Sequence, residues 1–125
     1  MAKLPRISDT EWEIMRIVWN HHPIGANAIV DMLQKNDPTW HPITAKTLMN
    51  RLVRKGALGY EHQGRAYMYH PLARERDCVN KESESFLDRV FGGSVKTMVA
   101  HFVDQKRLNS GQLRELKKML DGDIK

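Results

Sequence analysis

Residues 42–56 read PITAKTLMNRLVRKG, and their spacing predicts an amphipathic helix that begins near the proline and ends at the glycine. Proline is favoured in the first helical turn, where its missing N–H group needs no partner, and glycine commonly follows a helix. Apolar residues at positions i, i+3, i+4, i+7 and i+8 form one face suited to a core. These apolar residues are Ala45, Leu48, Met49, Leu52 and Val53, and the opposite face carries Lys46, Thr47, Asn50, Arg51 and Arg54.

Charge is distributed unevenly around this helix. The chain of 125 residues has 20 Lys and Arg against 15 Asp and Glu, a net charge of +5 with neutral histidines. No acidic residue lies between Asp37 and Glu61, although Lys46, Arg51, Arg54 and Lys55 fall in that window. A basic helix without acidic neighbours is typical of a surface that binds a polyanion. The alternative interpretation is a solvated helix face.

Two more helices are predicted before this segment. Ser8 and Glu11 have the spacing of a capping box, which predicts a helix that starts there and ends by residues 21–25. A second helix is expected over residues 26–34, before the break at residues 36–38, which read NDP.

After the basic helix, residues 58–62 and 66–69 alternate around Gly64 and predict a β-hairpin. Three helices followed by a hairpin form a winged helix-turn-helix, whose third helix usually enters the DNA major groove. We therefore expect a mainly α fold with a small β-hairpin wing, and a winged-helix DNA-binding domain over residues 1–71.

Residues 72–125 show only helical patterns and are predicted to form a helical dimerisation domain. The helices are expected over residues 75–91, around residues 95–103, and after Asn109, with Gln112 at the capping-box position. Helices this short and few bury little surface alone, so a symmetric homodimer is the economical solution. The predicted dimer interface consists of Phe86, Val90, Phe91, Val99, Phe102, Leu113, Leu116 and Leu120.

Several segments resemble the BlaI/MecI/CopY family of bacterial repressors. They are residues 8–15 (SDTEWEIM) with Trp19, residues 40–48 (WHPITAKTL), Arg51-Leu52, Lys55-Gly56, the tyrosines Tyr67 and Tyr69, and residues 86–102. The resemblance implies a winged-helix homodimer that binds a dyad operator, often with TACA/TGTA-like arms. It also implies a transcriptional repressor of β-lactamase, methicillin-resistance, copper-homeostasis or other resistance and stress genes.

Polar side chains of the third helix are the candidate DNA contacts. Arg and Asn can bind guanine and adenine edges in a bidentate way. We expect Lys46 and Thr47 near base edges, and Arg51 and Arg54 mainly on phosphates. Thr44 either simply caps the helix or uses its hydroxyl on a phosphate as well, and Arg65 at the wing tip contacts the DNA backbone. The predicted DNA-binding residues are Thr44, Lys46, Thr47, Asn50, Arg51, Arg54 and Arg65.

Aromatic residues raise a separate question, because they also stack on nucleic acids. Trp12 and Trp19 share an apolar helical face, so core packing is favoured for both. Trp40 either packs against the core or contacts DNA in part. One face of the strand that holds Tyr67 and Tyr69 is core, and the pattern does not indicate which hydroxyl reaches solvent.

Regulation in the resembled family takes two forms. One is proteolysis at an Asn-Phe bond in the dimerisation domain, which links the repressor to a membrane sensor-protease pathway. The matching dipeptide here is His101-Phe102, which keeps the phenylalanine and lacks the asparagine, and Phe102 is first a core or interface residue. The other form uses paired Cys-X-Cys motifs to bind copper. This chain has one cysteine, Cys78, so thiolate copper sensing is excluded, and we expect neither metal nor cofactor.

Other classes of protein are disfavoured by composition and motifs. No apolar stretch has the roughly 20 residues of a membrane span, so no membrane insertion is expected, and no secretory leader is predicted. A single cysteine is typical of a reduced compartment, which indicates the cytoplasm. No nucleotide-binding or hydrolase motif is present, so we predict that the protein is not an enzyme. The remaining alternative is a winged-helix module for protein–protein contact, which the salt dependence of DNA binding would distinguish.

Overall fold

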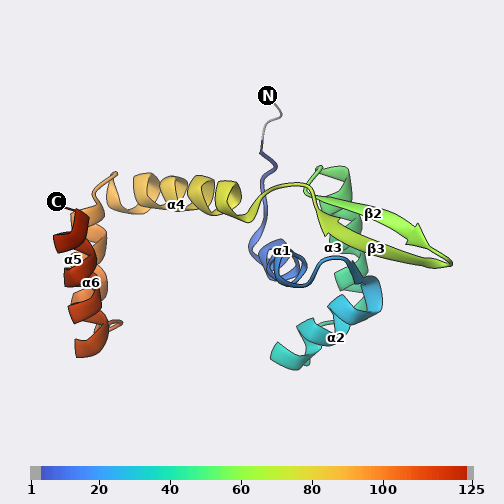
Figure 1. The fold of residues 1–125 in the computed structure, drawn as a ribbon, viewed down its shortest axis with the longest axis horizontal. Helices are drawn as coiled ribbons and strands as arrows, with labels where there is room; N and C mark the ends of the chain where they lie inside the picture. The colour runs from blue at the N-terminus through green and yellow to red at the C-terminus, as the bar shows by residue number, and fades with distance from the viewer. Residues whose placement is uncertain (1–3, 124–125) are drawn as a thin grey trace. The chain divides into compact units, whose positions relative to one another are not determined.

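The computed structural model describes residues 4–123 and confirms a mainly helical fold with a small antiparallel sheet (Figure 1). The chain divides into two compact units, one ending at Asn80 and the other beginning at Lys81. The boundary suggested by the sequence, between Pro71 and Leu72, stays a prediction. The first unit holds α1 (Asp9–His21), β1 (Ile24–Gly25), α2 (Ala26–Asn36), α3 (Pro42–Arg54), β2 (Leu58–Gln63) and β3 (Ala66–Pro71).

Helix α1 begins with the predicted capping box. The Ser8 hydroxyl accepts a hydrogen bond from the Glu11 N–H at 3.3 Å, and the Glu11 carboxylate accepts one from the Ser8 N–H at 2.8 Å. These bonds satisfy two backbone donors that the first turn leaves without helical partners. The inward face of α1 is fully buried at Ile14, Met15 and Val18.

Helix α3 has the predicted core face but a different N-cap. His41 is the cap residue, and its Nδ1 accepts a hydrogen bond from the Ile43 N–H at 3.2 Å. The interpretation of Thr44 as the cap was therefore wrong, because Pro42 already occupies the first helical turn. Ala45, Leu48, Met49 and Leu52 are buried and Val53 is half-buried, as the apolar pattern predicts.

The end of α3 is a Schellman motif. The Ala57 N–H donates to the Leu52 carbonyl and the Gly56 N–H donates to the Val53 carbonyl, both at 3.0 Å. Gly56 has a φ of +82°, a conformation that a side chain makes costly. The predicted glycine stop is thus confirmed, and it directs the chain straight into β2.

The sheet has three strands in the order β1-β3-β2, one more than the predicted hairpin. Strand β1 has only two residues, and Ile24 pairs with Tyr69 on the central strand β3. A strand of two residues carries no alternating pattern, so its position could not be predicted. Strands β2 and β3 pair along their whole length, and Gly64 turns the chain between them with a φ of +65°.

The tryptophans Trp12 and Trp19 pack against the core as expected. Their ring centroids are 5.3 Å apart in an edge-to-face arrangement, and both rings are half-buried. The Trp19 indole Nε1–H donates a hydrogen bond to the Ala73 carbonyl at 2.9 Å. This bond ties the segment after β3 to α1, and the buried Cys78 extends the same core into the following helix.

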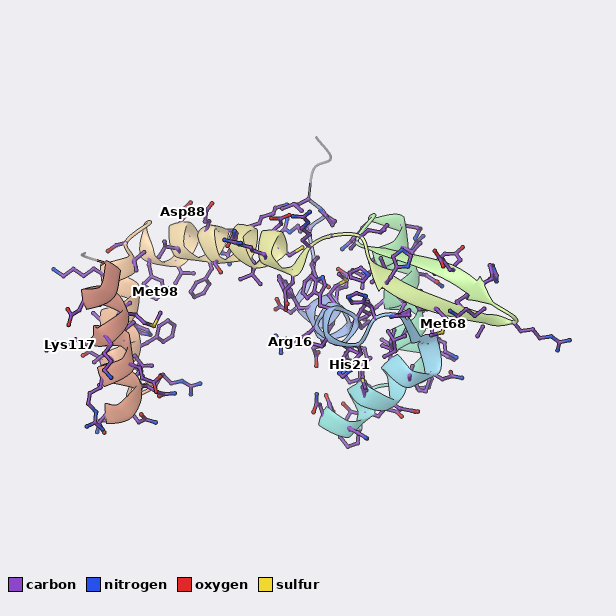
Figure 2. The ribbon with its side chains drawn as sticks, in the orientation of Figure 1. Arg16, His21, Met68, Asp88, Met98 and Lys117 are labelled. Carbon is purple, nitrogen blue, oxygen red and sulfur yellow. The ribbon has the colours of Figure 1, made fainter. Side chains whose placement is uncertain are left out.

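The remaining helices are α4 (Glu75–Phe91), α5 (Val95–Asp104) and α6 (Ser110–Asp123). Ser94 caps α5 by accepting the Thr97 N–H at 3.1 Å. Asn109 and Gln112 exchange hydrogen bonds of 2.8 and 3.0 Å at the start of α6, which confirms the predicted capping-box pair. No side chain described between Lys81 and Gly122 is fully buried. Met98, labelled in Figure 2, lines an open groove with Phe86 and Leu87.

Candidate nucleic-acid interface

The predicted DNA-contacting residues are all exposed, and six of the seven lie on α3. The seventh, Arg65, lies in the turn between β2 and β3, at the end of the hairpin that projects from the helices of this unit (Figure 1). One helix therefore brings the main set together, whereas Arg65 belongs to a separate element. The exposed residues on α3 are Thr44, Lys46, Thr47, Asn50, Arg51 and Arg54.

Lys55, the last basic residue of the acid-free window, is engaged within the fold. Its Nζ lies 2.6 Å from the Glu11 Oε1 and 2.8 Å from the Arg6 carbonyl oxygen. Glu11 has no exposed surface. A buried carboxylate needs a partner, so Lys55 joins the end of α3 to the start of α1. The positive charge that α3 presents to solvent is thus carried by Lys46, Arg51 and Arg54.

The pKa of the Glu11 carboxyl reflects this contact. Burial acts to raise the pKa, because it disfavours the charged form. Hydrogen bonds from Lys55 and Ser8 favour the carboxylate and outweigh burial, so the pKa of Glu11 lies below its ordinary value. Glu11 is therefore ionised at neutral pH and holds Lys55 away from the exposed face of α3.

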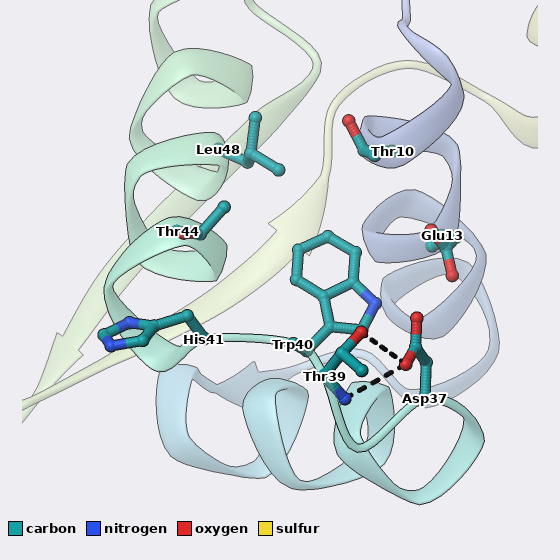
Figure 3. Close-up of a pocket in the computed structure, with 8 residues that line it drawn as sticks. All are labelled: Thr10, Glu13, Asp37, Thr39, Trp40, His41, Thr44 and Leu48. Atoms are coloured by element: carbon teal, nitrogen blue, oxygen red, sulfur yellow. Dashed lines mark hydrogen bonds between the residues drawn. The ribbon is translucent and has the colours of Figure 1, made fainter.

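An open groove of about 350 Å³ lies beside the first turns of α3 (Figure 3). The indole of Trp40 lies between Thr44 on α3 and Thr10 on α1, and it is half-buried against the core. Core packing is thus shown for Trp40. The carboxylates of Glu13 and Asp37 also line the groove, so its charge differs from that of the basic exposed face of α3. Its lining residues are Thr10, Glu13, Asp37, Thr39, Trp40, His41, Thr44 and Leu48.

The turn before α3 is held by side-chain hydrogen bonds. The Asp37 Oδ1 accepts the Thr39 hydroxyl at 2.6 Å and the Thr39 N–H at 3.0 Å (Figure 3). These bonds lower the pKa of Asp37, with the hydroxyl contributing most. The Gln34 side-chain amide donates to the Trp40 carbonyl at 3.0 Å. Together these hydrogen bonds stabilise the turn that connects α2 to α3.

The wing carries its aromatic side chains on one face. Tyr60 pairs with Tyr69 and His62 pairs with Tyr67 across the hairpin. The rings of Tyr60 and Tyr67 are 4.8 Å apart, and those of His62 and Tyr67 are 4.5 Å apart. Tyr67 is 46% exposed and Tyr69 is buried, which answers the question that the sequence left open. Burial, with smaller contributions from Tyr60 and Tyr67, raises the pKa of Tyr69.

One residue of the exposed α3 face was missed by sequence reasoning. Ile43 is 70% exposed, more than the other large apolar side chains that the structure describes. The signal was present in the sequence, because Ile43 lies outside the apolar positions that begin at Ala45. Ile43 was counted only as part of the helix start, so its apolar side chain was not predicted to lie on the polar face of α3.

The predicted dimer residues have partly or largely exposed side chains. Phe91 is central to a ring cluster, with centroids 5.7 Å from Phe86 and 6.2 Å from Phe102. The cleavage candidate His101-Phe102 lies inside α5, where Phe102 is half-buried and His101 is exposed. Residues Phe86, Phe91, Val99, Phe102 and Leu116 are half-buried, and Val90, Leu113 and Leu120 are exposed.

Within residues 4–123, no group of three His, Cys, Asp or Glu side chains could hold a metal ion. No described helix is both long and apolar enough to cross a membrane.

Three helices, an antiparallel hairpin and an exposed basic third helix define a winged helix-turn-helix protein. The model of the penicillinase repressor family matches residues 7–122. The chain therefore belongs to the penicillinase repressor family, whose members are transcriptional repressors and not enzymes.

Two curated relatives match nearly the whole chain. The penicillinase repressor of Bacillus licheniformis is 37% identical over 121 residues, which are 97% of this chain and 94% of the relative. The methicillin resistance regulatory protein MecI of Staphylococcus aureus (strain N315) is 32% identical over 119 residues, which are 95% and 96% of the two chains. The family assignment therefore extends beyond the winged helix.

Two solved structures match the first unit. The solution structure of the DNA-binding domain of the repressor BlaI has a TM-score of 0.55 and 42% identity, and covers 62% of this chain and 93% of that one. The Bacillus licheniformis BlaI monomeric form in complex with the blaP half-operator has a TM-score of 0.53, with the same identity and coverage. The winged-helix assignment is thus confirmed by fold and by sequence.

Proposed function

We propose that this protein is a homodimeric transcriptional repressor that binds a dyad operator in the cytoplasm. Its target would be a β-lactamase gene or another resistance or stress gene. The observation that carries the proposal is the exposed polar face of α3, free of acidic residues, in a chain that matches repressors over nearly all its length. The solved BlaI complex with a half-operator supports the choice of DNA as the ligand.

Residue roles follow from the position of each side chain on α3. Lys46, Thr47 and Asn50 lie on the exposed face and suit contacts to base edges. Arg51 and Arg54 suit phosphate contacts, because long guanidinium groups near the helix end can reach the backbone. Thr44, which does not cap α3, and Arg65 in the wing complete the proposed backbone contacts.

The homodimer is supported by the apolar surface of the second unit. Val90 and Leu120 are 51% and 58% exposed, and no described side chain from Lys81 to Gly122 is fully buried. A second copy with the same surface would cover these residues, and a two-fold axis would present two copies of α3 to the two arms of an operator.

Selection of bound sequences from random duplex DNA, followed by gel shift at fixed salt, tests the proposal. Arg51→Ala should weaken operator binding by about tenfold or more, since a hydrogen bond between charged groups is worth roughly 1.5–3 kcal/mol. Arg114→Ala, an exposed arginine on α6, is the matched control and should bind like the wild type. Unchanged affinity of Arg51→Ala would remove this residue from the interface.

Salt dependence distinguishes the alternative function, a winged-helix module for protein contact. A dimer that contacts several phosphates should lose affinity steeply as salt rises. No binding to duplex DNA at low salt would favour the protein-contact module. Apart from Ile43, the exposed face of α3 is polar, which argues against that alternative, because protein interfaces are enriched in aromatic and apolar anchors.

Proteolytic control through a membrane sensor-protease pathway would act at the bond between His101 and Phe102. The bond lies in the interior of α5, so a protease could reach it only after local unfolding. The ring of Phe102 already packs near Phe91. This ring contact supports a packing role for Phe102 within the second unit. Replacement of the family's asparagine by His101 weighs against cleavage.

A further inference from the structure

Ile43 is an apolar side chain on the polar face of α3. It is 70% exposed, and no core contact accounts for its size, because the core face of the helix begins at Ala45. Its backbone N–H is bound by the His41 imidazole, so the residue sits at a defined point in the first turn. The side chain therefore projects from a backbone position that the His41 cap holds.

Helical spacing places Ile43 in the middle of the exposed face. Side chains three, four and seven positions apart share one side of a helix, so Ile43 forms a stripe with Thr47 and Asn50. The same spacing puts this stripe opposite Ala45 and Met49, which have no exposed surface. Ile43 thus projects directly away from the core, at the end of the helix that normally meets base edges.

The major groove contains one prominent apolar group, the 5-methyl group of thymine. The other base edges in the groove present hydrogen-bond donors and acceptors, which an isoleucine cannot satisfy. An aliphatic side chain facing the groove therefore favours thymine, because burying the two hydrocarbon surfaces together removes both from water.

We propose that Ile43 recognises a thymine in each operator arm by contacting its 5-methyl group. The inference rests on the proposed DNA-binding function. It adds a specificity-determining residue that is uncharged and whose side chain makes no hydrogen bond to DNA. Lys46, Thr47 and Asn50 would then read polar edges on the same stretch of groove, and Ile43 would discriminate against cytosine at one position.

The test uses the full chain and the duplex obtained by selection. Each thymine is replaced in turn by deoxyuridine, which pairs in the same way and lacks only the methyl group. At one position in each arm, the replacement should reduce wild-type affinity about fourfold, since a buried methyl-sized group is worth roughly 0.8 kcal/mol. Ile43→Ala should lose affinity for the thymine duplex and become insensitive to deoxyuridine at that position, whereas Ile43→Val should keep the sensitivity.

Leu72→Ala is the matched control, because Leu72 is an aliphatic residue that is 58% exposed and lies outside α3. It should keep both the affinity and the deoxyuridine effect. Ile43→Ala should melt like the wild type, since the side chain it removes is exposed.

Two results would overturn the inference alone. In one, Ile43→Ala binds the operator as tightly as the wild type. In the other, it stays as sensitive as the wild type to deoxyuridine at every thymine. A change in oligomeric state in Ile43→Ala without any deoxyuridine coupling would assign the residue to a protein contact instead. If the wild-type protein binds no DNA at low salt, the proposed function itself fails, and that outcome is separate from the others.

Discussion

Two helices with the same apolar spacing have different surroundings in this chain. In α3 the residues Ala45, Met49 and Leu52 have no exposed surface. In α5 the same pattern is occupied by Val95, Met98, Val99, Phe102 and Val103, yet no residue of that helix is buried and Val95 is 56% exposed. The pattern shows that a helix face needs to be covered, and it does not show what covers it.

The two units therefore differ in how their folded states are expected to be stabilised. The first unit buries its apolar side chains within one chain and includes all three tryptophans. The second leaves its apolar side chains partly exposed, so we expect its stability to depend on a partner that covers them. The first unit is expected to fold regardless of association, whereas the second is expected to need a second copy.

The largest effect is expected from a substitution in the core of α3. Leu52→Ala should lower the free energy of unfolding of the first unit by about 3 kcal/mol, because it removes a fully buried side chain and leaves a cavity. Urea unfolding followed by tryptophan fluorescence measures this unit alone, since Trp12, Trp19 and Trp40 all lie in it. Leu120→Ala on α6 removes the same group from an exposed site, and an equal loss there would contradict the comparison.

An aromatic substitution in the second unit should act on association instead. Phe91→Ala should raise the dimer dissociation constant about 30-fold, or roughly 2 kcal/mol, because Phe91 is central to the ring cluster with Phe86 and Phe102. Sedimentation equilibrium measures the constant. Tyr67→Ala, which removes a half-exposed ring from the wing, should leave the dimer intact. A dimer unaffected by Phe91→Ala would place the interface elsewhere.

A smaller effect is expected where α3 is joined to α1. Lys55→Met should lower the free energy of unfolding by about 1–2 kcal/mol at neutral pH, since it leaves the buried Glu11 carboxylate without its cation. The expected loss lies in the lower part of the range that is usual for an unpaired buried group, because the Lys55 side chain is 31% exposed. Lys46→Met, at an exposed site on the same helix, should cost little, and urea titration compares the two.

The same contact predicts a dependence on pH. The folded pKa of Glu11 is lowered, so its stabilising contribution is present above the ordinary glutamate pKa of about 4.3 and is lost as pH falls through the lowered value. In Lys55→Met the Lys55 hydrogen bond no longer lowers the pKa of Glu11, so burial, which raises the pKa, is opposed only by the hydrogen bonds from Ser8. The stability lost in Lys55→Met should therefore be largest at neutral pH and should shrink as pH falls, because protonation of Glu11 removes the unpaired buried charge. A stability difference from the wild type that is the same at neutral and acid pH would show that the pair does not control this pKa.

Much of the fold could be predicted from local signals. The capping box at Ser8, the glycine after α3 and the wing turn each depend on a few neighbouring residues, and the structure confirms them. Strand β1 and the His41 cap could not be predicted. A two-residue strand forms only because Tyr69 lies beside it, and His41 caps α3 through a side-chain geometry that several residues near Pro42 could have supplied.

Only part of the candidate site could be predicted, because only that part depends on local signals in the sequence. The exposed positions on α3 follow from helical periodicity, so they could be assigned from the sequence. The engagement of Lys55 by Glu11 joins residues 44 positions apart and has no local signal. The basic window therefore included a lysine that belongs to the fold, and Ile43 was overlooked because an apolar residue was not expected on a polar face.

Hydrogen exchange over a wide range of protein concentration tests the difference between the two units most directly. Amides in α5 and α6 should lose protection as the protein is diluted below its dimer dissociation constant, while amides in α3 keep theirs. We therefore predict that amide protection depends on protein concentration in the second unit and not in the first. Protection of α5 and α6 that does not change with concentration would contradict it, because the second unit would then be stable without a partner.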